Sequence, residues 1–357
     1  MITPRWKILL AAAAVWMAGC GPSDTVTIQG CGATFPAPLY KRWFLEYYRL
    51  HPDVRVNYQA IGSGAGVRQF EEGLVHFGAT DEALKEKRID EIAKKLSDRD
   101  GHKVEVVQIP LTGGSVALCY NLPGNPAIQL TRKAYVSILL GQITYWDDPG
   151  ITSINPGVQF PHLAIAFIRR AESSGTTFVF TNHLNAADKR WSKDQGGPGV
   201  GKTVQWPVGI GGKGNAGVAA LIEQTPGAFG YIETGYAELS HLPIAAVENR
   251  AGKFVKPTLA SSQEALAEAR FDKVLGATVS DPSGPGAYPI VSLTWVVCRK
   301  NYADKTITDQ LKAVLGYCLE TNVSGQGQAI SKELEYVALP VEALVKARQA
   351  VASIGTE

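Results

Sequence analysis

The segment Gly32-Ala33-Thr34-Phe35-Pro36-Ala37-Pro38 joins a short β-branched run to a stretch with helical periodicity. Much later, Arg170-Ala171-Glu172-Ser173-Ser174-Gly175-Thr176-Thr177 takes the same position between a predicted strand and a predicted helix. Both segments place small hydroxyl residues where a helix begins, and the second adds an arginine. The N–H groups of a helix start lack helical acceptors and carry the positive end of the macrodipole. The sequence therefore predicts a strand–helix fold in which several helix starts bind one oxyanion.

Predicted strands and helices alternate along the rest of the chain. Strands are expected over residues 25–28, 54–58, 75–79, 104–110, 115–121, 163–168, 229–232 and 290–297. Helices are expected over residues 36–50, 67–73, 85–103, 132–140, 176–184, 216–224, 308–321 and 341–351. This alternation predicts an α/β architecture with mostly parallel sheets.

Length and charge narrow the class of protein. The chain has 357 residues, which is enough for two globular domains with separate cores. Its formal net charge of +2 argues against a nucleic-acid partner, because such proteins usually carry a basic stripe and a larger positive charge. An anion must therefore be held by local groups. The 37 glycines fit a protein that brings its backbone close to a ligand.

The N-terminus has the pattern of an export signal. Arg5 and Lys7 precede an apolar run over residues 8–15, and Met17-Ala18-Gly19-Cys20 matches a bacterial lipoprotein cleavage site. The apolar run is too short to span a bilayer, and its alternative interpretation is a buried strand. We predict a signal peptide over residues 1–19 and a lipid (palmitate) anchor on Cys20. The protein would then be periplasmic or otherwise extracytoplasmic and held at a membrane by that anchor.

The remaining cysteines do not determine their own redox state. An even number of cysteines in an oxidising compartment permits disulfides, here with three possible pairings. Most of them lie in or beside apolar strand-like runs, which equally fits buried free thiols. Both alternatives stay open for the four residues, Cys31, Cys119, Cys298 and Cys318.

Positive evidence for an enzyme is weak. The six histidines are scattered, and the sequence contains neither an H-E-x-x-H motif nor a G-x-S-x-G elbow. Residues 196–203 have the spacing of a nucleotide-binding P-loop, but polar residues precede them and an extended segment follows. Residues 209–214 match a dinucleotide-binding fingerprint, although Pro207 weakens the strand that should precede it. We therefore expect no enzyme activity, no cofactor and no metal.

Two further residues fit the same anion site. Ser63 stands among glycines where another strand leads into a helix, and Asp81 ends a short strand. Taken singly, each hydroxyl residue can be explained by an ordinary helix cap instead of an anion-binding role. Asp81 can likewise be explained as a turn residue. Arg170 favours the binding interpretation, because a guanidinium grips two oxygens of an oxyanion at once.

With these residues in place, the chain resembles the periplasmic phosphate-binding protein of the bacterial phosphate ABC importer. The resemblance covers nearly the whole chain after the signal and includes the stretch over residues 209–214, so the dinucleotide interpretation is set aside. Its carriers are residues 32–38, 58–67 (Tyr-Gln-Ala-Ile-Gly-Ser-Gly-Ala-Gly-Val), 77–81 (Phe-Gly-Ala-Thr-Asp), 146–148 (Trp-Asp-Asp), 169–176 and 206–215. Gly64-Ala65-Gly66 and Glu172 depart from the family, which often has a serine with two glycines and an aspartate there.

The resemblance implies a role for each matching residue. Backbone N–H and hydroxyl groups at three helix starts would donate to phosphate, Arg170 would supply the charged fork, and Asp81 would accept a hydrogen bond from a protonated phosphate oxygen. Sulfate has no such proton, so a buried carboxylate would repel it. The implied phosphate-binding residues are Thr34, Phe35, Ser63, Asp81, Arg170, Ser174, Gly175 and Thr176.

The resemblance also implies an architecture and partners. The fold would be the two-lobed periplasmic-binding-protein (type II) fold, with hinge strands and the ligand in the cleft between lobes. Residues 20–115 and 246–357 would form lobe I, and residues 116–245 lobe II. The partners would be inorganic phosphate and the permease and ATPase subunits of an importer, with the protein a monomer. The alternatives are a binding protein for another tetrahedral oxyanion, an exported phosphatase on this scaffold, or a surface protein used in sensing or adhesion.

Overall fold

An eight-stranded mixed sheet runs through the whole molecule. The computed structural model describes residues 25–356, and the predicted signal peptide and the predicted lipid attachment at Cys20 lie outside these residues. The strand order is β2-β1-β3-β11-β4-β8-β6-β7. The strands are β1 (Val26–Gly32), β2 (Val54–Ala60), β3 (Phe77–Thr80), β4 (Val106–Tyr120), β6 (Ala166–Arg170), β7 (Ile210–Gly212), β8 (Ala228–Glu233) and β11 (Val291–Arg299).

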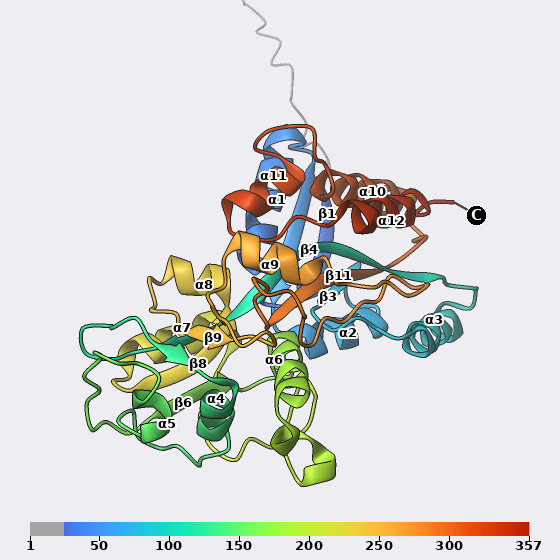
Figure 1. Cartoon of the computed structure of the whole chain (residues 1–357). Coiled ribbons are helices and arrows are strands. Elements are labelled where there is room, and N and C mark those ends of the chain that lie inside the picture. Colours follow the sequence, from blue (N-terminus) through green and yellow to red (C-terminus); the bar gives the residue numbers. More distant parts are fainter. Residues whose placement is uncertain (1–24, 357) are drawn as a thin grey trace, which may run out of the picture.

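Helices surround the two ends of this sheet and give the molecule two lobes (Figure 1). The first lobe holds α1 (Ala37–Leu50), α2 (Ser63–Glu71), α3 (Glu86–Asp100), α9 (Leu259–Leu266), α10 (Lys305–Cys318), α11 (Gly327–Glu333) and α12 (Val341–Ala352). The second holds α4 (Arg132–Leu139), α5 (Pro149–Thr152), α6 (Gly175–Ala187), α7 (Gly214–Gln224), α8 (Thr234–Leu239) and the 3₁₀ turns η1 (Lys189–Trp191) and η2 (Lys193–Gln195). The α/β class and the two-lobed fold are therefore confirmed.

The prediction of mostly parallel sheets is wrong for the centre of the sheet. Strands β2, β1 and β3 are parallel, and so are β8, β6 and β7. Between these groups, β11 pairs antiparallel with β3 and β4, and β4 pairs antiparallel with β8. The reason is that β4 belongs to both lobes: its first part pairs with β11 and its last part with β8.

Strand β4 was predicted as two strands, residues 104–110 and 115–121, and is one. Gly113 and Gly114 suggest a turn in the sequence, but here they make room for neighbours. A Cβ on Gly113 would stand 2.4 Å from Leu266, and one on Gly114 would stand 2.9 Å from the Phe35 ring. Glycine inside a strand often marks such a close approach. The strand therefore continues across the predicted gap from one lobe into the other.

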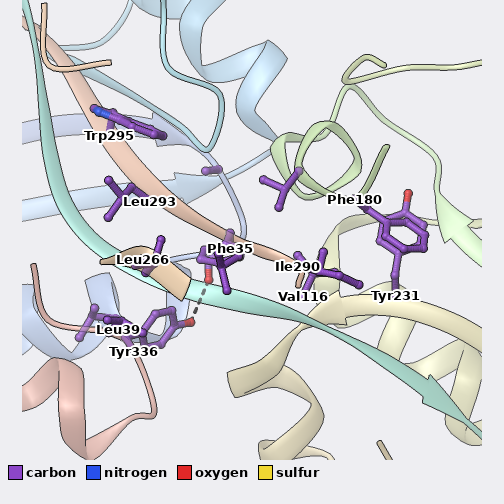
Figure 2. Close-up of a cluster of buried hydrophobic side chains, with 14 of the residues drawn as sticks. Phe35, Leu39, Val116, Phe180, Tyr231, Leu266, Ile290, Leu293, Trp295 and Tyr336 are labelled. Atoms are coloured by element: carbon purple, nitrogen blue, oxygen red, sulfur yellow. Dashed lines mark hydrogen bonds between the residues drawn. The ribbon is translucent and has the colours of Figure 1, made fainter. Parts of the chain in front are cut away.

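One hydrophobic cluster surrounds this crossing. Figure 2 shows Phe35, Leu266 and Tyr336 around one part of β4, and Phe180 and Tyr231 farther along it. The Phe180 and Tyr231 rings lie 4.6 Å apart between centroids. The same strand thus contributes to the hydrophobic cores of both lobes. The segments of the candidate site pack against these cores through residues such as Phe35 and Phe180.

A small second sheet bears on the predicted lobe boundary. Strands β5 (Gln129–Leu130), β9 (Ala246–Glu248) and β10 (Phe254–Val255) form it in the order β10-β9-β5. Because β9 pairs with β5, residues 246–255 are joined to a segment of the proposed lobe II. The lobe boundaries therefore stay a prediction, with β9 beginning directly after the predicted boundary at residue 245.

Two further sequence questions are answered within residues 25–356. All four cysteines there are buried free thiols, so the disulfide alternative is not realised. None of the helices in the described part of the chain is both long and apolar enough to cross a membrane.

Candidate functional site

The eight predicted site residues lie together where four strands lead into four helices. Thr34 and Phe35 follow β1, Ser63 begins α2, Asp81 follows β3, and the residues from Arg170 to Thr176 join β6 to α6. All eight are buried, although four separate segments supply them. The first N–H groups of α2 and α6 have no acceptor within their own helices. The structure therefore assembles the predicted helix starts into one buried place.

In the first lobe, Ser63 and Asp81 contact each other directly. The backbone N–H of Asp81 donates to Ser63 Oγ at 3.3 Å, and Ser63 Oγ lies 3.4 Å from Asp81 Oδ2. From β11, Thr294 donates its hydroxyl to Asp81 Oδ1 at 2.9 Å. Thr294 was missed by the sequence analysis, because nothing local marks a threonine inside a strand as a partner of a distant aspartate.

Burial governs the protonation of Asp81. Desolvation raises the pKa of this carboxyl to about 7, against the opposing effects of the Thr294 hydrogen bond and the Arg170 charge. A carboxyl with that pKa changes its charge near neutral pH. It can accept a hydrogen bond when ionised and donate one when protonated.

In the second lobe, Glu172 holds the Arg170 guanidinium. Arg170 Nε donates to Glu172 Oε1 at 3.0 Å, and Arg170 Nη2 makes a shorter contact with the same oxygen. Arg170 Nη1 donates to Thr176 Oγ1 at 3.0 Å. A guanidinium has five N–H donors, so one on each Nη remains for a ligand. Glu172, which is one methylene longer than the aspartate that the family often has here, thus still pairs with Arg170.

Glu172 also accepts hydrogen bonds from the start of helix α7. The backbone N–H of Gly214 donates to Glu172 Oε1 at 3.2 Å and to Oε2 at 3.3 Å. Burial opposes ionisation of Glu172, but the Arg170 charge and these hydrogen bonds lower its pKa overall. The carboxylate therefore stays charged and joins the arginine to the start of α7.

Asn215 links the two lobes inside the site. Its Nδ2 donates to Thr34 Oγ1 at 3.0 Å and to Thr176 Oγ1 at 3.3 Å. Since Arg170 and Asn215 make both hydroxyl oxygens acceptors, the hydroxyl protons of Thr34 and Thr176 remain to be donated elsewhere. Sequence reasoning missed Asn215, although it ends the stretch over residues 206–215 that resembles the family.

Two tyrosines donate hydrogen bonds to the backbone carbonyls of Thr34 and Phe35. Tyr236 donates to the carbonyl of Thr34 at 2.8 Å, and Tyr336 donates to the carbonyl of Phe35 at 2.8 Å. The carbonyl of Thr34 and the N–H of Phe35 belong to one trans peptide unit and point in opposite directions. Fixing the carbonyl therefore fixes the direction in which the Phe35 N–H points.

The lobes are in contact around this site. Gly64 N–H donates to the carbonyl of Ser173 at 3.1 Å. Beside it, Lys202 Nζ forms an ion pair with Glu82 Oε2 at 2.6 Å. These contacts join α2 to the segment that begins α6, and the residue after Asp81 to the loop between η2 and β7, so the structure has the closed arrangement of the two lobes.

The competing motifs do not form the sites that they resemble. Residues 196–203 lie between η2 and β7 and open no helix, so they lack the strand–loop–helix geometry of a P-loop. Residues 209–214 contain β7 and enter α7, as a glycine-rich helix start does. Among residues 25–356, no group of three or more His, Cys, Asp or Glu side chains is placed to hold a metal ion.

Comparisons with known sequences agree with this geometry. A sequence model described as the PBP superfamily domain matches residues 21–322. A phosphate-binding protein PstS of Pasteurella multocida is 34% identical over 324 residues, which are 90% of this chain and 88% of that protein. A protein of the same name from Methanocaldococcus jannaschii is 36% identical over 321 residues, covering 85% of this chain and 80% of that one.

Solved structures share the fold. A phosphate-binding protein from Stenotrophomonas maltophilia superposes with a TM-score of 0.73 at 22% identity, covering 91% of this chain and 93% of that chain. A high-affinity periplasmic phosphate-binding protein (PfluDING), bound with phosphate, gives a TM-score of 0.72 at 22% identity with the same coverage. At this identity the likeness concerns the arrangement of helices and strands.

Proposed function

Because this chain belongs to the PBP superfamily and, within it, to the phosphate-binding proteins PstS, we propose that it binds inorganic phosphate and passes it to an ABC-type importer. The observation that carries the proposal is the convergence of anion-binding groups from both lobes on one buried site. Thr34, Ser63 and Asp81 come from one side, and Arg170 with the start of α6 from the other.

Several donor groups of the site still have a hydrogen available for phosphate after their contacts within the protein are counted. The hydroxyl protons of Thr34 and Thr176 and the two unengaged N–H groups of Arg170 would donate to phosphate oxygens. The N–H groups of Phe35 and of the helix starts at Ser63 and Gly175 would add backbone donors. Ser174 already caps α6 by accepting from the N–H of Thr177 at 3.1 Å, so its hydroxyl proton can also turn to the ligand.

Asp81 would provide the selectivity. Near neutral pH phosphate still carries a proton, and an ionised Asp81 would accept it in a hydrogen bond. Sulfate would meet the same carboxylate with acceptors only, and a buried charge without a partner is costly. No reaction of the phosphate is part of this proposal; an anion bound between the lobes favours the closed state by contacting both of them.

Calorimetric titration of the full-length protein, extracted in mild detergent, tests this function. Phosphate is expected to bind and sulfate to give no heat near pH 8, where Asp81 is mostly ionised. Asp81→Asn should bind both sulfate and phosphate, because its side-chain amide can donate a hydrogen bond to either anion. Binding of neither anion by the unsubstituted protein would contradict the proposal, and equal binding of both would reassign the site to another oxyanion.

The remaining parts of the proposal concern location and assembly. We propose that residues 1–19 are removed, that a lipid on Cys20 anchors the protein to a membrane outside the cytoplasm, and that it acts as a monomer beside the permease and ATPase. Cys20→Ser should move the protein from the membrane fraction to the soluble fraction. A variant that stays in the membrane fraction would contradict the anchor.

A further inference from the structure

A second buried carboxyl group lies behind the proposed phosphate site. Glu233 ends β8, and its side chain is fully buried. Its Oε1 accepts from the N–H of Gly235 at 2.8 Å, and its Oε2 lies 2.9 Å from the hydroxyl of Tyr336. Glu233 has no role among the groups that would touch the ligand.

The hydroxyl of Tyr336 has two neighbours that both require a proton. It lies 2.8 Å from the carbonyl oxygen of Phe35, shown as a dashed line in Figure 2, and 2.9 Å from Glu233 Oε2. A phenol has a single proton, and a carbonyl oxygen can only accept. If Glu233 were ionised, it too could only accept, and one of the two short contacts would join two acceptors.

A proton on Glu233 Oε2 satisfies both contacts. The acid O–H then donates to the Tyr336 oxygen, and the Tyr336 O–H donates to the carbonyl of Phe35. We propose that Glu233 is a protonated carboxylic acid that positions the Phe35 segment of the anion site through Tyr336, and that losing this proton weakens phosphate binding. The second half of this inference rests on the proposed function, and the first half does not.

The surroundings of Glu233 favour the neutral acid. Burial raises the pKa of Glu233 to about 8, against the hydrogen bonds from Gly235 and Tyr336, and the Asp81 charge raises it further. The other titratable neighbours are the Tyr336 and Tyr236 phenols, and burial, together with Glu233, raises the pKa of both. The nearby cation, Arg170, is paired with Glu172.

The consequence appears when pH rises. Above the pKa of Glu233 the acid becomes a carboxylate, which competes with the carbonyl of Phe35 for the single proton of Tyr336. The charge-assisted hydrogen bond is the stronger of the two. The carbonyl of Phe35 then loses its donor, and the segment that presents the Phe35 N–H loses one of its two tyrosine supports.

Infrared spectroscopy tests the proton without any ligand. A protonated carboxylic acid has a C=O stretch that a carboxylate lacks. The full-length Asp81→Asn protein, which removes the other buried acid of the site, should show this band at pH 7 and lose it as pH rises through about 8. The double variant Asp81→Asn/Glu233→Gln should lack the band that titrates. Absence of the band from Asp81→Asn at pH 7 would overturn the inference.

Calorimetry with inorganic phosphate tests the positioning role. The Gln variant of Glu233 carries a permanent donor in place of the acid proton, so its affinity should fall less between pH 7 and pH 9.5 than that of the unsubstituted protein. The expected difference is about three- to tenfold, the value of one hydrogen bond. Comparing both proteins at each pH cancels the ionisation of phosphate itself.

Tyr336→Phe supplies the control, because it breaks the link to Phe35. In this background Glu233→Gln should no longer change the pH dependence of phosphate affinity. If it still does, Glu233 acts by another route and the positioning role is wrong. If Asp81→Asn shows the infrared band but the unsubstituted protein binds no phosphate, the protonated acid stands, while the proposed function and the affinity effect both fail.

Discussion

Gly175, at the start of α6, lies against the side chain of Asp81 from the other lobe. A Cβ built on Gly175 would stand 2.4 Å from Asp81 Oδ2 and 2.4 Å from Ser63 Oγ. Both distances are far inside van der Waals contact, and both neighbours are buried. The closed arrangement of the lobes therefore depends on the absence of a side chain at this position.

Gly175→Ala is expected to weaken phosphate binding by about five- to 150-fold, because overpacking of this kind costs about 1–3 kcal/mol. Titration calorimetry measures the change. Gly316→Ala is the matched control, since a Cβ there, in α10, meets nothing within 4 Å. Equal affinities of the two variants would show that the lobes close without the contact between Gly175 and Asp81.

Sulfate binding by the unsubstituted protein should depend on pH. As pH falls from 9 toward 7, Asp81 takes up a proton and becomes a donor, because burial has raised its pKa to about 7. Sulfate affinity should then increase by about tenfold per pH unit and level off below pH 7. Asp81→Asn should bind sulfate with little change across this range. A sulfate affinity of the unsubstituted protein that is the same at pH 6 and pH 9 would contradict the role of Asp81.

Stability without ligand should fall as pH rises. The pKa of Asp81 is raised from 3.8 to about 7, so the folded state holds a proton that the unfolded state has released. The free energy of unfolding should therefore decrease between about pH 4 and pH 7, by at most about 1.4 kcal/mol per pH unit for this group. Glu233 adds a decrease of the same sign up to about pH 8.

Urea unfolding at several pH values measures this slope. Asp81→Asn should remove its share, whereas Glu342→Gln, a change on the exposed face of α12, should keep it. An unchanged slope in Asp81→Asn would mean that Asp81 is not protonated in the folded protein.

The ion pair between Lys202 and Glu82 should stabilise the closed state weakly. Both side chains are partly exposed, at 25% and 29%, and such pairs contribute about 0–1 kcal/mol. Lys202→Met should lower phosphate affinity by no more than about fivefold, and the loss should shrink at high salt. Lys305→Met, which removes a surface pair within α10, serves as the control. A loss that does not respond to salt would point to direct contact of Lys202 with the anion.

The sequence predicted the local parts of this structure well. Helix α1 was expected over residues 36–50 and spans Ala37–Leu50, because its apolar stripes and its prolines are local signals. Helix α2 was expected from residue 67 and begins at Ser63, since the glycines before it look like a turn in isolation. Helices α8, α9 and α11 were missed because they are short and are held mainly by packing.

The residues of the candidate site also fall into those that local sequence predicted and those that it did not. The hydroxyl residues near the helix starts were predictable because a strand-to-helix transition is a local pattern, although among them only Ser174 caps its helix through its side chain. Asn215 and Thr294 were not, since each acts on residues far away in the chain.

By itself, the sequence determined most of the longer strands and helices and the hydroxyl residues, arginine and aspartate of the candidate site. Periodicity and helix capping act over a few residues, so they can be read from the chain directly. Only the tertiary structure decided that β4 serves both lobes, that Gly175 meets Asp81, and that Tyr336 needs a proton from Glu233. Tyr336 and Phe35 stand 301 residues apart in the chain, and a contact over that separation exists only after the sheet has formed. Burial on this sheet, which no local pattern reports, is also what raises the pKa values of Asp81 and Glu233.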